Sequence, residues 1–236
     1  MKPILLKLSG ELFKTTASGH DVCMDTALVG QIIKQIQILS STHHISIVVG
    51  GGNFFRGAKE GHALSLRPTT ADSVGMLATV MNSLILRDFF YNHKIACTIL
   101  SPFPIPGIIQ PIDQAIIDHA RINNQVIIFA GGTGNPFFTT DTTAVLRALQ
   151  VGAQEVWKAT KVEYVYDADP VKNPDAKQLK KISYTDVLQK KLQVMDLTAI
   201  TLAQEHNIVI RVFSLFSPDA LLHVAQDPEF GSTICT

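Results

Sequence analysis

The chain has few cysteines, few charged residues and no excess charge of either sign. Its 236 residues include three cysteines, Cys23, Cys97 and Cys235, which are scattered and lack CxxC spacing. Such a set argues against a disulfide framework and is typical of a reducing compartment. Charged residues make up 17% of the chain, against about 25% in average soluble proteins. This shortage indicates a large core, with surface that partner subunits could cover.

Lysine plus arginine number 20 and aspartate plus glutamate number 20, so the formal net charge is zero. Proteins dedicated to nucleic acid usually carry a basic excess, so we expect no nucleic-acid partner. No apolar run approaches the roughly 18 to 20 residues that span a bilayer. The apolar run after Met1 is also too short for a signal peptide. We therefore expect a cytoplasmic protein without a membrane partner.

The common nucleotide and metal motifs are missing as well. No GxxxxGK[ST] segment occurs, which excludes a P-loop kinase. The segment Gly132-Thr133-Gly134 continues to Phe137 where the third glycine of GxGxxG belongs, so the dinucleotide fingerprint also fails. No HExxH occurs, and the adjacent His43-His44 fits a polar helix end better than a metal site.

What the chain does contain is a regular alternation of short apolar runs and helical periodicity. Strands are predicted at 3–8, 45–49, 95–100, 126–130, 155–158 and 208–213, and helices at 28–39, 74–89, 112–120, 142–149 and 218–225. This alternation predicts an α/β fold with a mainly parallel central sheet sandwiched by helices. Because the strands are apolar throughout, both faces of the sheet are expected to be covered.

We find no linker and no internal repeat, and expect a single domain over residues 1–236. Asp25 is a plausible N-cap for the first helix. The segment Ser183–Asp186 resembles a capping box that opens another helix. Residues 162–169, which lie between these two helices in the chain, could form a hairpin or an irregular loop.

Three glycine-rich turns follow predicted strands: Ser9-Gly10, Gly50–Gly52 and Gly131–Gly134. In open α/β sheets, ligands bind at the carboxyl ends of the strands. Glycine lets the backbone approach a ligand, and the exposed N–H groups, with a following helix N-terminus, suit phosphate. Three such turns at one edge favour a polyphosphate site over turns that serve the fold alone.

Several charged side chains accompany these turns, each with two interpretations. Lys7 could neutralise charge on a transferring phosphoryl group, or be a strand-end lysine that reaches water; Arg56 is a similar candidate. Asp72 could be an N-cap or accept hydrogen bonds from a ribose. Asp141 could be an N-cap, orient Lys7 or hold Mg²⁺ through water. Phe137-Phe138 could plug the core or shape a pocket for a base.

Seven segments together resemble one family. They are ILLKLSGE (4–11), VVGGGNFFRG (48–57), ADSVGMLATVMN (71–82), GGTGNPFFTTDTTA (131–144), KATKVEYVYDADP (158–170), QVMDLTA (193–199) and IRVF (210–213). Within the first two, KLSGE and GGGN are shared across the amino acid kinase superfamily, whereas GMLATVMN and TGNPFFTTD are specific to its uridylate branch. The chain therefore resembles the bacterial uridylate kinases, over almost its whole length.

The resemblance implies an amino acid kinase-like fold and phosphoryl transfer from ATP to UMP in pyrimidine nucleotide synthesis. It also implies Mg²⁺ as cofactor and a homohexamer. It places an acceptor-binding part at about 1–150 and an ATP-binding part at about 151–236. Two alternatives are another kinase of the superfamily, with a carboxylate or carbamate acceptor, and a non-catalytic nucleotide-binding protein of the same fold.

The resemblance also assigns site residues, carried over only where the motifs match. The expected catalytic residues are Lys7, Arg56 and Asp141. Those expected to bind ATP are Lys7, Ser9, Gly10, Gly52, Arg56, Thr160, Tyr166 and Asp169. Those expected to bind UMP are Gly51, Asp72, Thr133, Gly134, Asn135, Pro136, Phe137, Phe138, Thr139 and Thr140. No residue is expected to hold Mg²⁺ directly, because ATP carries it.

This chain departs from the family pattern at two places. Glu163-Tyr164 stands where the family usually has Asp-Gly, so a bulky side chain is expected to reshape the nucleotide loop beside Tyr166. The stretch Leu12–Asp21 lacks the usual glycine-rich pattern. In relatives this stretch contributes to control by GTP, so activation by GTP is not carried over to this chain.

Overall fold

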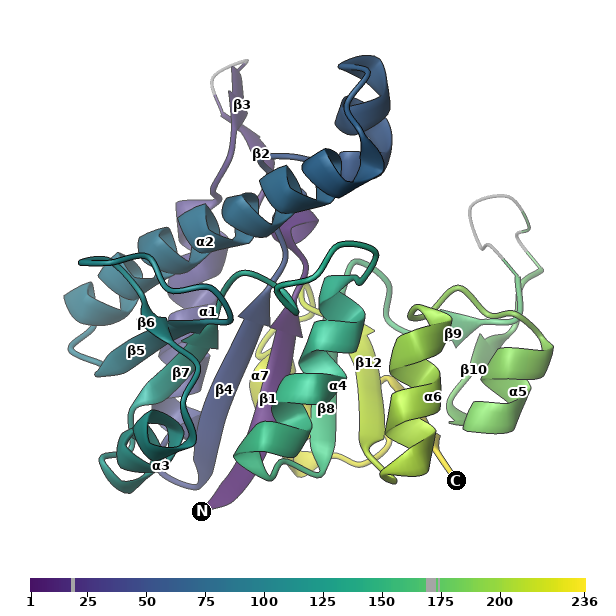
Figure 1. Cartoon of the computed structure of the whole chain (residues 1–236). Coiled ribbons are helices and arrows are strands. Elements are labelled where there is room, and N and C mark those ends of the chain that lie inside the picture. Colours follow the sequence, from purple (N-terminus) through teal and green to yellow (C-terminus); the bar gives the residue numbers. More distant parts are fainter. Residues whose placement is uncertain (18–19, 169–172, 174) are drawn as a thin grey trace.

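The computed structural model describes residues 1–17, 20–168, 173 and 175–236, and within them an α/β sandwich (Figure 1). The strands are β1 (Lys2–Leu8), β2 (Thr15–Ala17), β3 (His20–Val22), β4 (His43–Val49), β5 (Cys97–Ser101), β6 (Gln110–Pro111), β7 (Val126–Phe129), β8 (Glu155–Thr160), β9 (Val165–Tyr166), β10 (Gln178–Leu179), β11 (Lys181–Ser183), β12 (Val209–Ser214) and β13 (Ser232–Cys235). The helices are α1 (Thr26–Leu39), α2 (Pro68–Asn92), α3 (Gln114–Ile122), α4 (Thr140–Val151), α5 (Tyr184–Gln189), α6 (Leu197–Glu205) and α7 (Ala220–Gln226), with short helical turns at Gly10–Leu12 and Gly57–Gly61.

The central sheet has the strand order β11-β13-β12-β8-β1-β4-β7-β5-β6 among the described residues. Strand β1 lies at its middle and pairs in parallel with β4 on one side and β8 on the other. Strand β12 continues the parallel pairing beyond β8, whereas β13 runs antiparallel to β12. The predicted mainly parallel sheet is therefore confirmed, with its six predicted strands.

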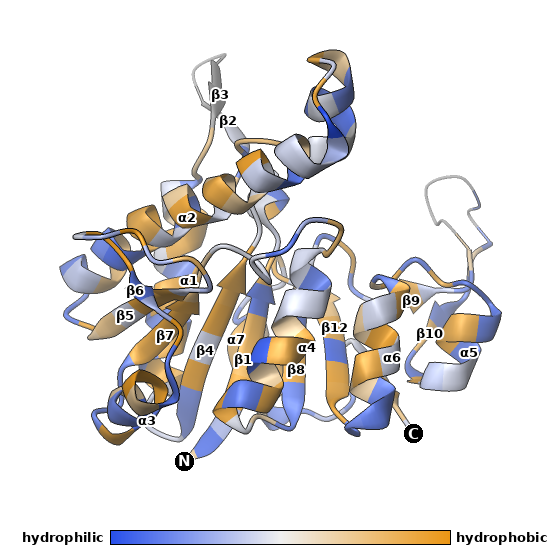
Figure 2. Cartoon of the chain, in the orientation of Figure 1, coloured by the Kyte–Doolittle hydropathy of each residue, from blue (hydrophilic) through white to orange (hydrophobic). Residues whose placement is uncertain are grey.

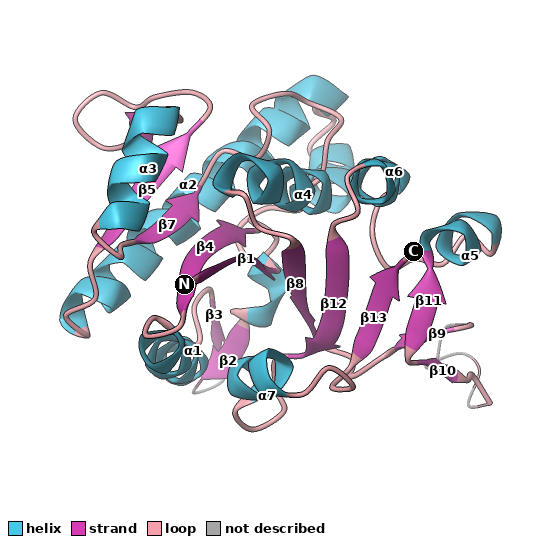
Figure 3. Cartoon of the chain, turned by 90° about the horizontal axis from the view of Figure 1, so that it is seen from below, coloured by secondary structure: helices cyan, strands magenta, loops and turns pink. Residues whose placement is uncertain are grey.

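Helices cover both faces of this sheet (Figure 3). Helices α1 and α7 lie on one face, and α3, α4 and α6 lie on the other. The residues of β1 alternate between the two layers: Ile4, Leu6 and Leu8 pack toward α1, whereas Leu5 packs toward α4. Figure 2 shows the hydrophobic character of β4 and β7, which are buried between these layers. By the same alternation, Lys7 faces the layer of α4.

Local signals explain where most helices begin. The carboxylate of Asp25 accepts a hydrogen bond from the Leu28 N–H at 3.0 Å, and the Ser183 hydroxyl accepts one from the Asp186 N–H at 3.0 Å. Both predicted caps are therefore confirmed. His43-His44 begins β4 instead of ending a helix, so that expectation was wrong.

In the described part of the chain, no group of three His, Cys, Asp or Glu side chains is arranged to hold a metal ion.

The segment after β8 contains a short antiparallel pair, β9 with β10, rather than a wholly irregular loop. Its register aligns Tyr166 with Gln178 and Val165 with Leu179. Among the described helices, none is both long enough and apolar enough to cross a bilayer.

Gly231, just before β13, provides a test of the backbone geometry. It has φ +77°, and a Cβ there would lie 2.3 Å from the Val212 carbonyl oxygen. We expect Gly231→Ala to lower the free energy of unfolding by about 2 kcal/mol or more. Urea denaturation at one protein concentration measures this change.

The matched control is Gly30→Ala. Gly30 lies inside α1, and a Cβ there would meet nothing within 4 Å. Alanine is the better helix former, so this variant is expected to gain about 0.5–1 kcal/mol. Equal stability of the two variants would contradict the account of Gly231.

Candidate functional site

The glycine turns converge at the carboxyl edge of the sheet. They follow β1, β4 and β7, which are neighbours in the sheet. A Cβ on Gly10 would lie 2.6 Å from both the Gly50 carbonyl oxygen and the Gly52 nitrogen. The third turn bends through positive φ at Gly131 and Gly132. The edge is thus lined by closely approaching backbone, as expected for a phosphate site.

A buried group of charges lies just below this edge, formed by Lys7, Asp141 and Lys158, here called the lysine–aspartate cluster. The ammonium of Lys7 lies 2.7 Å from Asp141 Oδ1, and that of Lys158 lies 2.6 Å from Asp141 Oδ2. Lys158 also donates a hydrogen bond to the Val194 carbonyl oxygen. Lys7 is only 6% exposed, so the interpretation in which it reaches water was wrong. The pleat of β1 turns its side chain inward, toward α4.

The electrostatics of the cluster follow from burial and close contact. Burial alone would raise the pKa of the Asp141 carboxyl, but the attraction of Lys7 and Lys158 outweighs burial and holds that pKa below its usual value. Burial lowers the pKa of the Lys158 ammonium; attraction to Asp141 opposes this shift and repulsion from Lys7 adds to it. With both lysines protonated, one carboxylate contacts two cations, and Asp196 also attracts Lys158. The cluster therefore carries excess positive charge in a buried place, where an anion would be held strongly.

Helix α4 begins at the cluster, and its N-terminus is fixed by Thr139. The Thr139 hydroxyl accepts a hydrogen bond from the Asp141 N–H at 3.0 Å and donates one to Asp196. Asp141 is therefore in the first turn and not the N-cap, which corrects one of its interpretations. Thr142 Oγ1 donates to Asp196 Oδ1 at 2.7 Å, and Asp196 also caps α6 through the Ala199 N–H. Asp196 thus joins the N-termini of α4 and α6.

A smaller cavity of about 250 Å³ opens between α2 and the Gly131–Thr140 loop. Of the residues expected to bind UMP, those that line it are Gly51, Asp72, Asn135, Phe138, Thr139 and Thr140. Thr133, Gly134, Pro136 and Phe137 lie in the same loop but do not line it. Asp72 lies inside α2, since Pro68 already occupies the first turn, so the N-cap interpretation was wrong.

The carboxylate of Asp72 instead contacts the loop formed by residues 131–140. Its Oδ2 accepts a hydrogen bond from the Phe137 N–H at 2.8 Å, while its Oδ1 accepts none from the described residues. Phe137 is 73% exposed and Phe138 is 49% exposed, so the expectation of a core plug was wrong. Phe138 lines the cavity wall, where an aromatic ring can contact a flat ligand.

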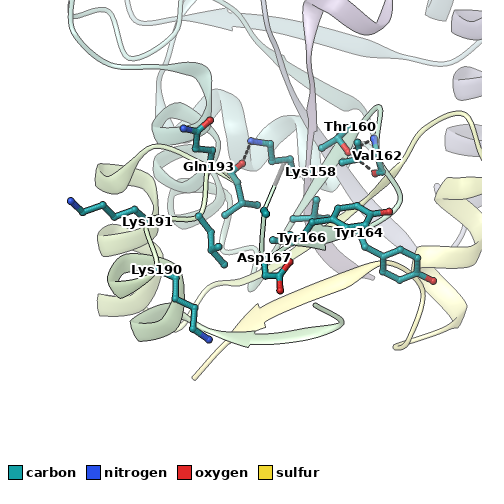
Figure 4. Close-up of a pocket in the computed structure, with 14 residues that line it drawn as sticks. Lys158, Thr160, Val162, Tyr164, Tyr166, Asp167, Lys190, Lys191 and Gln193 are labelled. Atoms are coloured by element: carbon teal, nitrogen blue, oxygen red, sulfur yellow. Dashed lines mark hydrogen bonds between the residues drawn. The ribbon is translucent and has the colours of Figure 1, made fainter. Parts of the chain in front are cut away.

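A larger cavity of about 560 Å³ opens on the other side of the cluster, beside β9 (Figure 4). Of the residues expected to bind ATP, Thr160 and Tyr166 line it, and Asp169 lies outside the described residues. It is not lined by Lys7, Ser9, Gly10, Gly52 or Arg56. Arg56 forms an ion pair with Glu11 at 3.2 Å, and its Nε donates to the Gly52 carbonyl oxygen at 3.2 Å.

The lysine–aspartate cluster connects the two cavities. Lys158 lines the larger cavity, while Thr140, next to Asp141 in the chain, lines the smaller one. A ligand in each cavity would therefore present its nearer end to the same excess positive charge. Such an arrangement suits a reaction between two anionic ligands, because it offsets their mutual repulsion.

Lys158 and Asp196 were missed from the sequence as site residues. Lys158, like Lys7, is a lysine inside an apolar strand, which was the available signal. Its pairing with Lys7 depends on β1 and β8 being neighbours, and these strands are far apart in the chain. Asp196 stands just before a helix, as an ordinary N-cap does. Nothing in the sequence indicates that it also forms hydrogen bonds to the start of α4.

Comparison with known proteins agrees with this geometry. The family model described as "Amino acid kinase family" matches residues 2–214. The chain belongs to the amino acid kinase family. It is 44% identical to the uridylate kinase of Haemophilus influenzae strain Rd, over 99% of this chain and 98% of that protein. It is 42% identical to the uridylate kinase of Chromohalobacter salexigens, over 99% of this chain and 91% of that protein.

Two solved structures have the same fold over nearly their full length. The crystal structure of UMP kinase from Ureaplasma parvum superposes with a TM-score of 0.93 at 32% identity, covering 100% of this chain and 99% of that one. The UMP kinase of Bacillus anthracis gives a TM-score of 0.92 at 30% identity, covering 99% and 96%. The amino acid kinase-like fold expected from the sequence is thus confirmed.

The buried charges make Asp141→Asn a direct test of the cluster. Removing the carboxylate leaves two ammonium groups buried side by side, so the variant is expected to lose about 3–5 kcal/mol of unfolding free energy at pH 7. In the parent chain the folded pKa of Asp141 lies below its unfolded value of about 3.9. The carboxylate thus stabilises the fold above that pH and loses this contribution as the pH falls through the lowered pKa.

The stability gap between parent and Asp141→Asn should therefore narrow in acid. Urea denaturation between pH 7 and pH 3 measures it. The control is Asp113→Asn at the exposed N-cap of α3, where asparagine caps about as well as aspartate. A gap that stays constant across this pH range would contradict the electrostatic account.

Proposed function

We propose that the chain transfers the γ-phosphoryl group of MgATP to UMP, giving ADP and UDP, as a step of pyrimidine nucleotide synthesis. The observation that carries the proposal is the lysine–aspartate cluster, buried between two cavities at the glycine-lined edge. The names of the full-length relatives support UMP as the acceptor.

The reaction needs no general base, because the acceptor oxygen of UMP is already anionic. That oxygen forms a bond to the γ-phosphorus of ATP while the bond from this phosphorus to the β–γ bridging oxygen breaks, and ADP leaves with the electron pair. Lys7 and Lys158 neutralise the charge that accumulates on the transferring group. Asp141 holds both ammonium groups in place, so little reorganisation accompanies the transfer.

We assign UMP to the smaller cavity and ATP to the larger one. In the acceptor cavity, Thr140 at the start of α4 suits the UMP phosphate, since the next two N–H groups, those of Asp141 and Thr142, already donate to Thr139 and Asp196. Oδ1 of Asp72 is positioned for a ribose hydroxyl, since Oδ2 already accepts the Phe137 N–H. In the donor cavity, Thr160 and Tyr166 lie on the side away from UMP. This assignment gives residues 1–150 mainly to the acceptor and 151–236 mainly to ATP, within one domain.

Magnesium is assigned to ATP and not to a protein-held site. The carboxylate closest to the transfer point, Asp141, has one oxygen against each lysine, which leaves it poorly suited as a metal ligand. The ATP phosphates supply the oxygens that Mg²⁺ prefers, and the bound ion adds further charge neutralisation. From the resemblance we also propose a homohexamer that works in the cytoplasm.

Lys7→Ala tests the assigned chemistry. Without this ammonium the transferring group loses one of its two protein cations, so kcat is expected to fall about a hundredfold or more. A coupled assay of ADP formation with MgATP and UMP measures it. Lys34→Ala, which removes an exposed lysine on α1, is the control and should match the parent. A Lys7→Ala variant with parental turnover would overturn the role of Lys7.

The acceptor is tested by a substrate panel in the same assay. UMP should be used at least about tenfold better than dUMP or AMP, because a site that hydrogen-bonds a hydroxyl discriminates against its absence and a small cavity discriminates against a larger base. Glutamate, aspartate and carbamate should give little ADP. Fast turnover of one of these three would instead indicate a carboxylate or carbamate kinase of the same family.

A further inference from the structure

Tyr164 is an aromatic residue of the larger cavity that the proposed chemistry does not use. It lines the cavity together with Tyr166, and both side chains are half-buried. Its φ is not positive, so the backbone there does not require the glycine that the family usually has. The tyrosine side chain is therefore accommodated in the nucleotide loop without backbone strain.

The two tyrosines lie close together in the chain, Tyr166 in β9 and Tyr164 in the bend just before it. Both line the same cavity, as does Val165 between them. Val165 is 7% exposed, its N–H donates to Ser232 Oγ at 2.9 Å, and β9 is paired with β10. Figure 4 shows both rings extending away from Lys190 and Lys191. The buried valine thus anchors a small aromatic platform.

The residues that line the larger cavity indicate where the phosphates and the base of a donor nucleotide would lie in it. Lys158 lines the cavity and belongs to the cluster where we propose that transfer takes place, so the phosphates of the donor are assigned beside it. The base of the donor then extends toward the tyrosines. Within the described part of the chain, neither ring forms an aromatic pair or a hydrogen bond, so their faces are available to a ligand. The volume of about 560 Å³ is within the usual range for a ligand site.

We propose that Tyr164 is a specificity-determining residue for the donor, stacking with Tyr166 on the base of the nucleoside triphosphate and favouring a purine over a pyrimidine. A purine has the larger ring system and so gains more from a second aromatic surface. The inference rests on the proposed function, because it takes the larger cavity as the donor site.

The test compares Tyr164→Gly and Tyr164→Phe with the parent chain by isothermal titration calorimetry. The probes are MgATP, MgCTP and inorganic tripolyphosphate. Tyr164→Gly is expected to raise the Kd for ATP about tenfold, with a smaller rise for CTP and no change for tripolyphosphate. Tyr164→Phe keeps the ring and should bind ATP within about twofold of the parent. Tyr91→Ala, which removes an 80% exposed tyrosine on α2, is the control.

Parental affinity of Tyr164→Gly for ATP would overturn the inference. An equal loss of affinity for all three probes would also overturn the inference. It would indicate a disturbed fold, and not the loss of stacking between the tyrosine ring and the base. The coupled assay separates the two proposals. A parent chain that binds ATP but makes no UDP contradicts UMP as acceptor, while the calorimetric comparison still decides the role of Tyr164.

Discussion

The contact of Asp141 with Lys7 and Lys158 is the interaction on which the site depends. It joins the two central strands β1 and β8 to the first turn of α4, and so fixes a helix N-terminus over the carboxyl edge of the sheet. One carboxylate contacts two ammonium groups, and Asp196 adds a further, smaller attraction to Lys158. The arrangement costs folding stability and favours an anionic ligand that can offset the remaining positive charge.

The surrounding architecture keeps that charge accessible from two sides. Asp196 ties the start of α4 to the start of α6, so the helix that carries Asp141 cannot tilt independently of its neighbour. Asp72 in α2 holds the Phe137 N–H and so fixes the opposite wall of the smaller cavity. The two cavities are thus separate, with the cluster as the element they share. In the proposed function, this separation keeps donor and acceptor bases apart while their phosphates meet.

The sequence predicted the features that local patterns determine. Continuous apolar strands, helical periodicity and the caps at Asp25 and Ser183 gave the α/β fold and its mainly parallel sheet, because each pattern reports on burial along one segment. Lys7 was singled out because it lies at the end of an apolar strand beside a glycine-rich turn, where a buried ammonium is costly without a partner. Lys158 has the same property, yet its role required the order of strands in the sheet, which depends on packing between distant segments. The N-cap interpretation of Asp72 was wrong because Pro68 starts α2 one turn earlier.

The excess charge also links ligand binding to folding. An anion that reaches the cluster supplies the missing counter-charge in a place where water is largely excluded, so it binds the folded state and not the unfolded chain. In the proposed function, the triphosphate of the donor is the larger anion and would meet the cluster on the side that Lys158 lines. Its binding would stabilise the fold and offset the repulsion between the two lysines. The charge imbalance that costs stability is thus the same feature that favours two phosphate groups meeting there.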